Sequence, residues 1–298
     1  MKITISGASG LIGRRLMKML AAEGHSLHVL SRHAGTNLPA GVELSVWDPV
    51  KGPPPDTGLR EAEGVVHLAG EPVAQRWTAE VKRRIRESRV AGTRHLVEAL
   101  ARLPRPPQVL VSASAIGYYG SRGDEILTSS SPPGTDYLAG VCTDWEREAA
   151  VAEELGMRVV RVRIGVVLDA RGGALPRMLP PFRMGLGGKL GDGRQWMSWI
   201  HLDDLAGVFR QALLQPLSGA VNGVAPYPVI NADFTRALAA ALHRPAIFPV
   251  PRFALRALFG EMADVLLASQ RAIPSTVEAS GYRFRFPQLA PALADLLK

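Results

Sequence analysis

The sequence predicts an α/β protein built on a doubly wound parallel sheet, because strand-like and helix-like patterns alternate along its first half. Short runs of β-branched and aliphatic residues have the composition of buried strands and lie at residues 2–6, 27–30, 42–46, 64–68, 109–112 and 158–164. Residues spaced as on amphipathic helices fill intervals between them, at 11–20, 78–103 and 141–155. Parallel strands share one carboxyl edge, so the residues that follow strand ends are expected to face one crevice: 7, 32, 68–70, 112–114 and 165–167.

A glycine-rich turn joins the first strand to the first helix. The strand runs into Gly7, Gly10 and Gly13, and the second strand follows the helix at 27–30. In a dinucleotide-binding unit the first glycine permits a tight turn, the second lets the backbone approach a pyrophosphate, and the third lets the helix pack closely on the strand. The N-terminus of the helix offers free N–H groups and a positive dipole end to phosphates. We therefore expect a nucleotide site, the alternative being a glycine turn without a ligand.

The end of the second strand distinguishes the two nicotinamide cofactors. An NAD site expects Asp or Glu about 20 residues after the last glycine, where it holds the ribose 2′-OH. Ser31 and Arg32 stand at that distance, His33 follows them, and no carboxylate is present there. A guanidinium offers planar donors suited to a phosphate. We therefore expect NADP(H), the alternative being that Arg32 is a solvated surface arginine.

Length and composition exclude several classes of protein. The chain has 298 residues, 47% of them hydrophobic, which is enough for one large α/β unit or two domains. No apolar run approaches the ~18 residues of a membrane span, and the N-terminus enters a strand directly, so neither a membrane helix nor a signal peptide is expected. Cys142, the one cysteine, is typical of a reducing cytoplasm. No Cys/His cluster has metal-ligand spacing, so no metal is expected.

The net charge of +8 does not indicate nucleic-acid binding, because the basic residues are spread along the chain. The densest cluster lies on the helix expected at 78–103 and consists of Lys82, Arg83, Arg84, Arg86 and Arg89. The same helix carries an apolar stripe, so a solvated face explains most of the cluster. Part of it is expected to meet an anionic cofactor.

The second half of the chain is less regular. Residues 171–195 are rich in Gly and Pro and are expected to form ordered loops beside a helix. A strand is expected at 197–202, then a helix capped by Asp203, and 251–270 is amphipathic. His201 with Asp203 and Asp204 indicates either a catalytic dyad or a helix cap, and we prefer the cap. Three tryptophans either line a substrate pocket or pack in the core: Trp77, Trp196 and Trp199.

Several segments spread over nearly the whole chain match the motifs of one family. They are Gly-Ala-Ser-Gly-Leu-Ile-Gly at 7–13, His-Leu-Ala-Gly-Glu-Pro at 67–72, Glu-Ser-Arg-Val at 87–90, Ser-Ala-Ser-Ala-Ile-Gly-Tyr-Tyr-Gly at 112–120, Arg-Ile-Gly-Val-Val-Leu at 163–168, Trp-Ile-His-Leu-Asp-Asp at 199–204 and Phe-Gly-Glu-Met at 259–262. On these motifs the chain resembles an extended short-chain dehydrogenase/reductase of the nucleotide-sugar-epimerase-like kind. More narrowly, it is similar to the "epimerase family protein" branch, because the C-terminal segments separate that branch from ordinary epimerases.

The resemblance implies a domain organisation and a set of cofactor contacts. It implies a Rossmann-like NADP-binding domain at 1–167, to which 196–225 return, and a smaller substrate lobe with the C-terminal tail at 168–195 and 226–298. The implied cofactor contacts are Gly7, Ser9, Gly10, Leu11, Ile12, Gly13, Ser31, Arg32, Leu68, Ala69, Gly70 and Val167. Arg89 is expected to reach the cofactor from the basic helix. The resemblance implies no substrate, because this branch is named by similarity.

The catalytic pair of the family is missing. Short-chain dehydrogenases use Tyr-x-x-x-Lys with an upstream Ser, the Lys charge lowering the pKa of the Tyr hydroxyl. No lysine of this chain has a tyrosine four residues before it. If Glu146 is the glutamate that follows the family's pair, Leu138 stands at the Tyr position and Cys142 at the Lys position. Ser114 matches the family's serine, and Tyr118 or Tyr137 would supply the proton.

Three interpretations stay open at this point. The protein is an NADP-dependent oxidoreductase or epimerase with an altered constellation, acting on an unknown small carbonyl or nucleotide-sugar-like substrate. Alternatively, it is an NADP(H)-binding sensor or regulatory protein with little turnover, or an assembly factor that keeps the cofactor for stability. We expect a small-molecule substrate, no nucleic-acid or membrane partner and a cytoplasmic location, and we leave a homodimer open.

Overall fold

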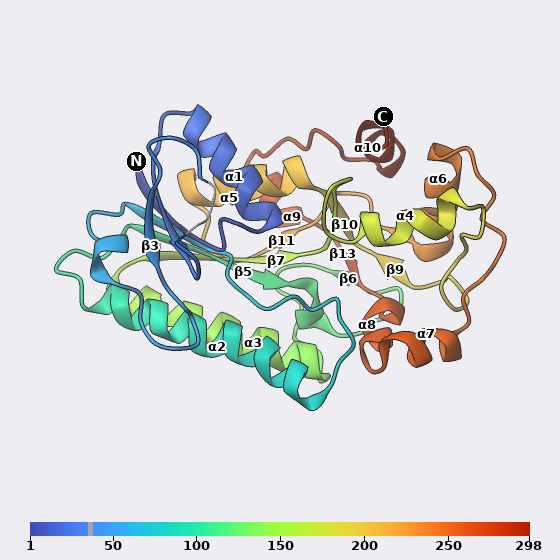
Figure 1. The fold of residues 1–298 in the computed structure, drawn as a ribbon, viewed down its shortest axis with the longest axis horizontal. Helices are drawn as coiled ribbons and strands as arrows, with labels where there is room; N and C mark the ends of the chain where they lie inside the picture. The colour runs from blue at the N-terminus through green and yellow to red at the C-terminus, as the bar shows by residue number, and fades with distance from the viewer. Residues whose placement is uncertain (35–37) are drawn as a thin grey trace.

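A seven-stranded parallel sheet lies at the centre of the fold (Figure 1). The computed structural model describes residues 1–34 and 38–298. The strand order is β11-β7-β5-β4-β1-β2-β3, with β1 Lys2–Ser6, β2 Ser26–Ser31, β3 Glu43–Val46, β4 Gly64–His67, β5 Val109–Ala115, β7 Arg158–Ile164 and β11 Gly219–Gly223. From β1 the chain adds β2 and β3 on one side of that strand, and it then crosses to the other side of β1 to form β4. Because the strand order reverses here, a crevice opens at the carboxyl ends of β1 and β4. The predicted fold class, a doubly wound parallel α/β sheet, is confirmed.

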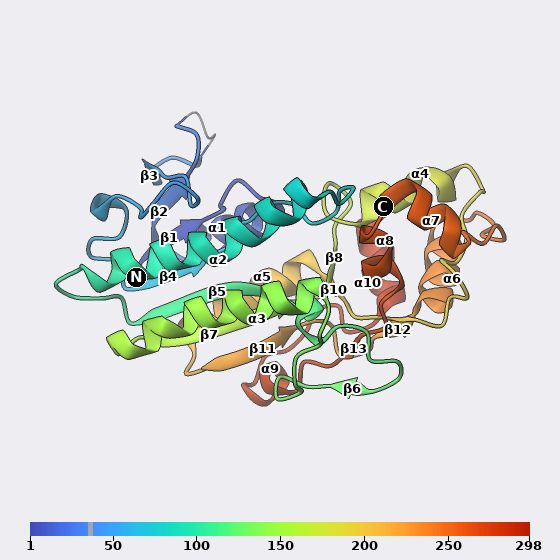
Figure 2. The same cartoon turned by 90° about the horizontal axis from the view of Figure 1, so that it is seen from below.

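Helices cover both faces of this sheet (Figure 2). Helices α1 (Leu11–Ala22) and α5 (Leu202–Leu214) pack together on one face, and α2 (Ala79–Ala101) and α3 (Tyr137–Ala150) on the other. The strands bury side chains on both faces: Ile3, Ile5 and Val29 belong to one core cluster, Leu30 and Val65 to another. Burial on both faces explains why these strands are continuous apolar runs in the sequence.

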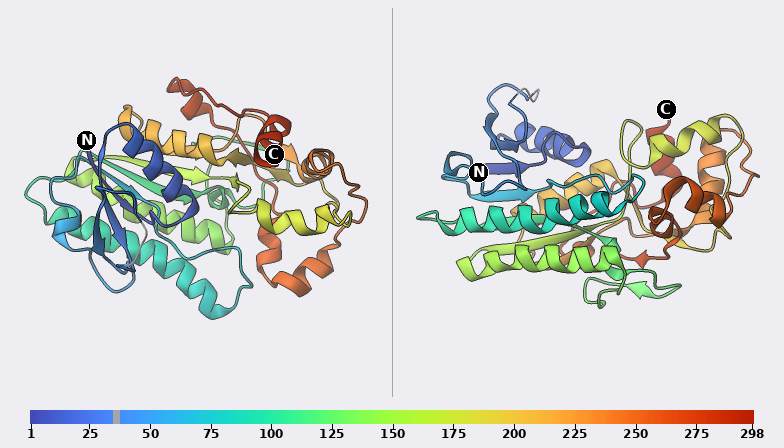
Figure 3. Two further views of the ribbon diagram at one scale, coloured as in Figure 1. Left: turned by 45° about the horizontal axis from the view of Figure 1, so that its top comes forward. Right: turned by 60° about the horizontal axis from the view of Figure 1, so that its bottom comes forward.

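A smaller group of helices lies beyond the carboxyl edge of the sheet (Figure 3). It contains α4 (Leu175–Arg183), α6 (Asn231–Ala241), α7 (Arg252–Phe259), α8 (Met262–Leu267), α10 (Leu289–Leu296) and the paired strands β9 (Trp196–Met197) and β12 (Val229–Ile230). This group has its own core, which includes Phe182, Phe234 and Leu293. Further pairs are β8 (Val166–Leu168) with β10 (Trp199–His201) and β6 (Ile126–Leu127) with β13 (Arg271–Ala272), and α9 (Ser275–Ala279) lies by β11. The domain boundary at residue 167 stays a prediction.

Three local expectations differ from the structure. Helix α3 begins at Tyr137 rather than Val141, because the Asp136 side chain caps it by accepting from the Ala139 N–H at 2.9 Å. The stretch 197–202 forms parts of two strands. The amphipathic stretch 251–270 forms two helices that are separated at Gly260, whose φ is +60°. The N-cap of α5 is His201 and not Asp203: His201 Nδ1 accepts from the Asp203 N–H at 3.0 Å. None of the helices in the described part of the chain is long and apolar enough to span a membrane.

Candidate cofactor and substrate site

The glycine turn between β1 and α1 is built without room for side chains. Gly7 has a φ of +71°, and a Cβ on it would lie 2.7 Å from the carbonyl carbon of Leu68. A Cβ on Gly13 would lie 2.4 Å from the Gly7 carbonyl oxygen. Helix α1 therefore starts directly against the end of β1, and its first turn contains no acidic residue and no side-chain cap. The exposed N–H groups and the positive dipole end are thus left for an anion.

This turn borders a cavity of about 590 Å³ at the carboxyl edge of the sheet, here called the turn cavity. Its lining includes Gly7, Ser9, Gly10, Ser31, Arg32, Leu68, Ala69 and Gly70. Arg32 is exposed and forms no ion pair within the described residues. Asp48 also lines the cavity and pairs with Lys51 at 3.6 Å. The structure thus brings together eight of the predicted cofactor contacts, with a guanidinium at the end of β2 that pairs with no carboxylate in the described part of the chain.

A buried histidine fixes the loop after β4, and sequence reasoning did not single it out. His67 Nδ1 lies 2.6 Å from Ser6 Oγ, and its Nε2 lies 3.1 Å from Thr93 Oγ1. Ser6 Oγ in turn accepts from the backbone N–H groups of Leu68 and Ala69. Burial lowers the pKa of His67 to about 4, with a smaller contribution from the charge of Arg89. The imidazole is therefore neutral at neutral pH and holds the backbone that lines the turn cavity.

Arg89 differs from the other cations of helix α2. Lys82, Arg83, Arg84 and Arg86 each pair with a carboxylate, as expected for a solvated face. Arg89 has no carboxylate within 4.0 Å among the described residues. Its guanidinium donates to the Ile85 carbonyl at 3.2 Å and lies 5.2 Å from the Trp145 ring. Desolvation lowers its pKa. A partly buried cation without a counter-ion is a site for an anionic ligand.

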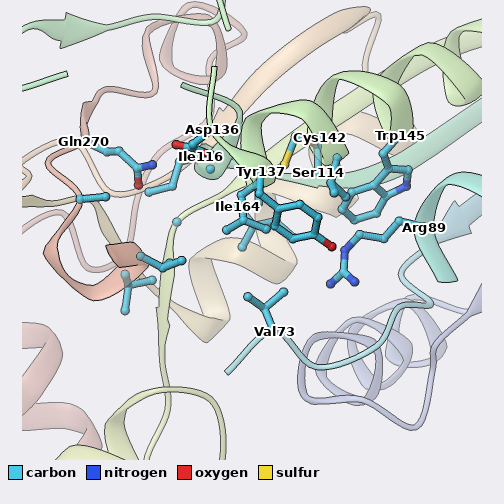
Figure 4. Close-up of a pocket in the computed structure, with 18 of the residues that line it drawn as sticks. Val73, Arg89, Ser114, Ile116, Asp136, Tyr137, Cys142, Trp145, Ile164 and Gln270 are labelled. Carbon is cyan, nitrogen blue, oxygen red and sulfur yellow. The ribbon is translucent and has the colours of Figure 1, made fainter. Parts of the chain in front are cut away.

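Arg89 also lines a second cavity of about 660 Å³, here called the serine cavity because Ser114 lies on its wall (Figure 4). Leu68 lines both cavities, and Ile12 lines the serine cavity. Ser114 lies in β5, one residue before its carboxyl end, and donates to Glu146 Oε1 at 2.6 Å. The two cavities therefore form neighbouring parts of the crevice, one at the glycine turn and one at Ser114.

The two candidate proton donors lie in different places. Tyr137 lines the serine cavity, donates to the Lys82 carbonyl and turns its hydroxyl toward the Arg89 guanidinium (Figure 4). Burial raises its pKa, so the phenol is protonated at neutral pH. Tyr118 does not line this cavity, and its ring centroid lies 3.4 Å from the guanidinium carbon of Arg163. Its neighbour Tyr119 is fully buried and donates to Asn222 at 2.6 Å.

The positions of the missing catalytic pair lie on the same wall as Ser114. Leu138 and Cys142 both line the serine cavity, one helical turn apart on α3. Both lie within 4 Å of a Cβ built on Gly117. Burial is the main cause that raises the pKa of the Cys142 thiol to about 12, so it is neutral. An apolar side chain and a neutral thiol therefore occupy the places of the phenol and the ammonium.

The remaining sequence candidates have other surroundings. Leu11 and Val167 line neither cavity: Leu11 packs near Gly172, and Val167 lies in β8 beside the sheet's core. Trp77 lines the serine cavity, whereas Trp199 is fully buried and Trp196 stacks with Arg271 at 4.3 Å. Within residues 1–34 and 38–298, no group of His, Cys, Asp and Glu could hold a metal.

These features define an extended short-chain dehydrogenase/reductase fold with a dinucleotide-type turn and a serine near the carboxyl end of β5. The chain belongs to the NAD dependent epimerase/dehydratase family, whose model matches residues 3–225. Residues 250–296 match a domain of unknown function, DUF1731. The resemblance to the "epimerase family protein" branch is confirmed.

Individual relatives match the chain over its whole length. It is 40% identical over 311 residues to the chloroplastic epimerase family protein SDR39U1 homolog of Arabidopsis thaliana, covering 100% of this chain and 87% of that one. It is 42% identical over 294 residues to epimerase family protein Mb2239 of Mycobacterium bovis, covering 98% and 96%. The crystal structure of human epimerase family protein SDR39U1 (isoform 2) with NADPH superimposes with a TM-score of 0.90 at 35% identity, covering 100% and 99%.

Proposed function

We propose that this protein binds NADP(H) along the crevice and acts as an oxidoreductase or epimerase-like enzyme on a small carbonyl or nucleotide-sugar-like substrate. The observation that carries the proposal is Arg89, a partly buried cation that lies between the two cavities and has no carboxylate partner among residues 1–34 and 38–298. It lines the serine cavity and lies against Gly70, which lines the turn cavity. The human relative crystallised with NADPH supports the choice of cofactor.

The residues of the crevice fit a phosphorylated dinucleotide. The N-terminus of α1 and Arg89 would hold the phosphates, because both present donors or positive charge that nothing in the described chain neutralises. Arg32 and Ser31 would hold the 2′-phosphate at the end of β2. Gly10 borders the turn cavity, and a Cβ on it would meet only the Gly7 oxygen at 3.2 Å, so its backbone is open to a ligand.

Protein groups would complete the reaction at Ser114. When bound, NADPH supplies a hydride to a carbonyl carbon, and the oxygen then needs a proton. Tyr137 donates that proton, since it is the tyrosine of the described chain that lines the serine cavity and its raised pKa keeps it protonated. Ser114 would orient the substrate oxygen by turning toward it the O–H that donates to Glu146 in this structure. A protonated phenol is the form that supplies a proton in carbonyl reduction.

The second interpretation, a sensor or regulatory protein with little turnover, has one observation in its favour. Leu138 and Cys142 replace the catalytic pair, and neither carries a charge that could lower the pKa of a phenol. An assembly factor stabilised by its cofactor would share this feature. We also propose a cytoplasmic location and an NADP-binding domain at 1–167. Whether the protein forms a homodimer stays an open question.

One titration tests the cofactor and a second assay tests the chemistry. Purified protein is titrated with NADPH and with NADH while nicotinamide fluorescence is followed, and NADPH is expected to bind more tightly. Equal or tighter binding of NADH would contradict the NADP(H) proposal. Consumption of NADPH is then screened against carbonyl compounds and nucleotide sugars. Turnover that Ser114→Ala abolishes supports the enzyme, and NADPH binding without turnover across the panel supports the sensor.

A further inference from the structure

We infer that the substrate is an uncharged, largely apolar carbonyl compound and not a nucleoside diphosphate sugar. This inference rests on the proposed function and narrows its substrate class. The observations that carry it are the charges and the apolar lining of the serine cavity, on the walls that face away from the glycine turn.

The apolar part of the wall comes from several distant segments of the chain. Val73 and Trp77 precede α2, Val141 lies on α3, and Val166 begins β8. Val265 and Ala268 come from α8 and the residue that ends it. Such a lining favours burial of an apolar ligand, at roughly 25 cal/mol per Å² of apolar surface removed from water.

The charged groups on this wall are carboxylates, and each has a partner. Glu261 pairs with Lys82 at 2.6 Å, and Asp264 pairs with Arg256 at 3.0 Å. Asp136 also lines the cavity and caps helix α3. The cationic residue that lines the cavity in the described chain is Arg89, and it lies against Gly70 at the side of the turn cavity. Once the cofactor phosphates take Arg89, the substrate space offers no unpaired positive charge.

A nucleoside diphosphate has different requirements. Its phosphates need arginine or lysine donors, most often as two-point contacts with a guanidinium. Here they would instead meet the carboxylates of Glu261 and Asp264 and a wall of aliphatic and tryptophan side chains. A desolvated anion without a partner is strongly disfavoured. An uncharged ligand has no such penalty and needs polar partners only for its oxygen, which Ser114, Tyr137 and Gln270 offer.

The test compares matched neutral and anionic ligands on the NADPH-loaded protein. NADPH binding is measured first. Loss of cofactor binding, which would contradict the proposed function, is thereby distinguished from loss of substrate binding. Calorimetry then measures binding of aryl and alicyclic ketones and of their carboxylate-bearing analogues, beginning with acetophenone and 4-acetylbenzoate, and of UDP-galactose. The neutral ketones are expected to bind at least about tenfold more tightly than their anionic analogues. UDP-galactose is expected to give no binding.

Variants of the acidic wall make the test specific. In the double variant Glu261→Gln, Asp264→Asn the preference for the neutral ketone is expected to fall by about threefold or more, because Lys82 and Arg256 become free to attract anions. Asp233→Asn is the matched control: Asp233 pairs with Arg236 on the exposed face of α6 and does not line the cavity. Binding of UDP-galactose more tightly than any neutral ketone, or an unchanged preference in the double variant, would overturn the inference. Failure of the whole neutral panel to bind would overturn it as well.

Discussion

Glu146 and Arg163 form a two-point ion pair inside the protein, with Arg163 Nε 2.8 Å from Glu146 Oε1 and Nη2 2.9 Å from Oε2. Both side chains are less than one-tenth exposed. The pair joins α3 to β7 directly beneath Ser114, whose hydroxyl donates to the same carboxylate. Hydrogen bonds to Glu146 and Tyr119 raise the pKa of Arg163, against the desolvation that lowers it, so the guanidinium stays charged. The carboxylate thus holds both Arg163 in the core and Ser114 near the carboxyl end of β5 in place.

Replacement of this carboxylate should destabilise the protein strongly. Glu146→Gln leaves the Arg163 guanidinium buried without a counter-ion, and the free energy of unfolding should fall by about 3–5 kcal/mol. The measurement is urea denaturation followed by circular dichroism. The control is Glu153→Gln, whose half-exposed carboxylate lies 3.5 Å from Arg161, and it should cost less than about 1 kcal/mol. Equal effects of the two variants would contradict the prediction.

Arg32 should determine the choice between NADPH and NADH. Arg32→Ala should weaken NADPH binding about tenfold or more, because a charged hydrogen bond to the 2′-phosphate is lost. Binding of NADH should change little. The dissociation constants are measured by nicotinamide fluorescence, with Arg60→Ala as the control, an exposed arginine that lines neither cavity. An unchanged dissociation constant for NADPH would refute this role.

Arg89 should matter for both cofactors and little for folding. Arg89→Met keeps much of the side-chain volume and should weaken NADPH and NADH alike by about tenfold or more, because a charge-assisted contact to phosphate is lost. The free energy of unfolding of the cofactor-free protein should change by no more than about 1 kcal/mol, since no carboxylate in the described chain loses a partner. A variant that unfolds easily but binds NADPH normally would show that Arg89 is a structural residue.

The sequence predicted the parts of the site that depend on local patterns. The glycine turn, strand ends and basic helix follow from spacing along the chain, so Gly7, Arg32 and Ser114 could be assigned before the structure. The sheet topology followed from alternation of strands and helices. These features need no knowledge of which distant side chains meet.

The other parts depend on contacts between distant segments. The resemblance singled out Arg89 through the Glu-Ser-Arg-Val motif, but spacing along the chain does not show that it differs from the four cations around it. Only the fold shows which of them have carboxylate partners. His67 lies within a recognised motif, yet its role comes from Ser6 and Thr93, which are far away in the chain. Asp203 has the residue type of an N-cap, but it pairs instead with Arg15, and His201 takes the cap.

His67 should make the stability of the protein depend on pH. Its pKa in the folded protein, about 4, lies below its ordinary value of 6.5. The folded state therefore resists protonation, so the contribution to stability is complete above pH 6.5 and is lost as the pH falls toward 4. The full loss amounts to about 3 kcal/mol.

A comparison of the wild-type protein with His67→Gln isolates the pH-dependent contribution of His67 to stability. The free energy of unfolding is measured by urea denaturation from pH 7 to pH 4, and the wild type should lose about 3 kcal/mol more than the variant over that range. His243→Asn is the control, because His243 is exposed and its φ of 52° suits asparagine. The same pH dependence in wild type and His67→Gln would contradict the assignment.

Tyr137 should act as an acid whose activity is constant through neutral pH. Burial raises its pKa above the ordinary value of 10, so with a carbonyl substrate kcat/KM should stay level through neutral pH and fall only in strongly alkaline solution. Tyr137→Phe should lower kcat by about 100-fold or more while the dissociation constant for NADPH stays the same. The control is Tyr227→Phe, which changes an exposed phenol outside both cavities. If Tyr118→Phe abolished turnover and Tyr137→Phe did not, the proton would come from the phenol that stacks on Arg163.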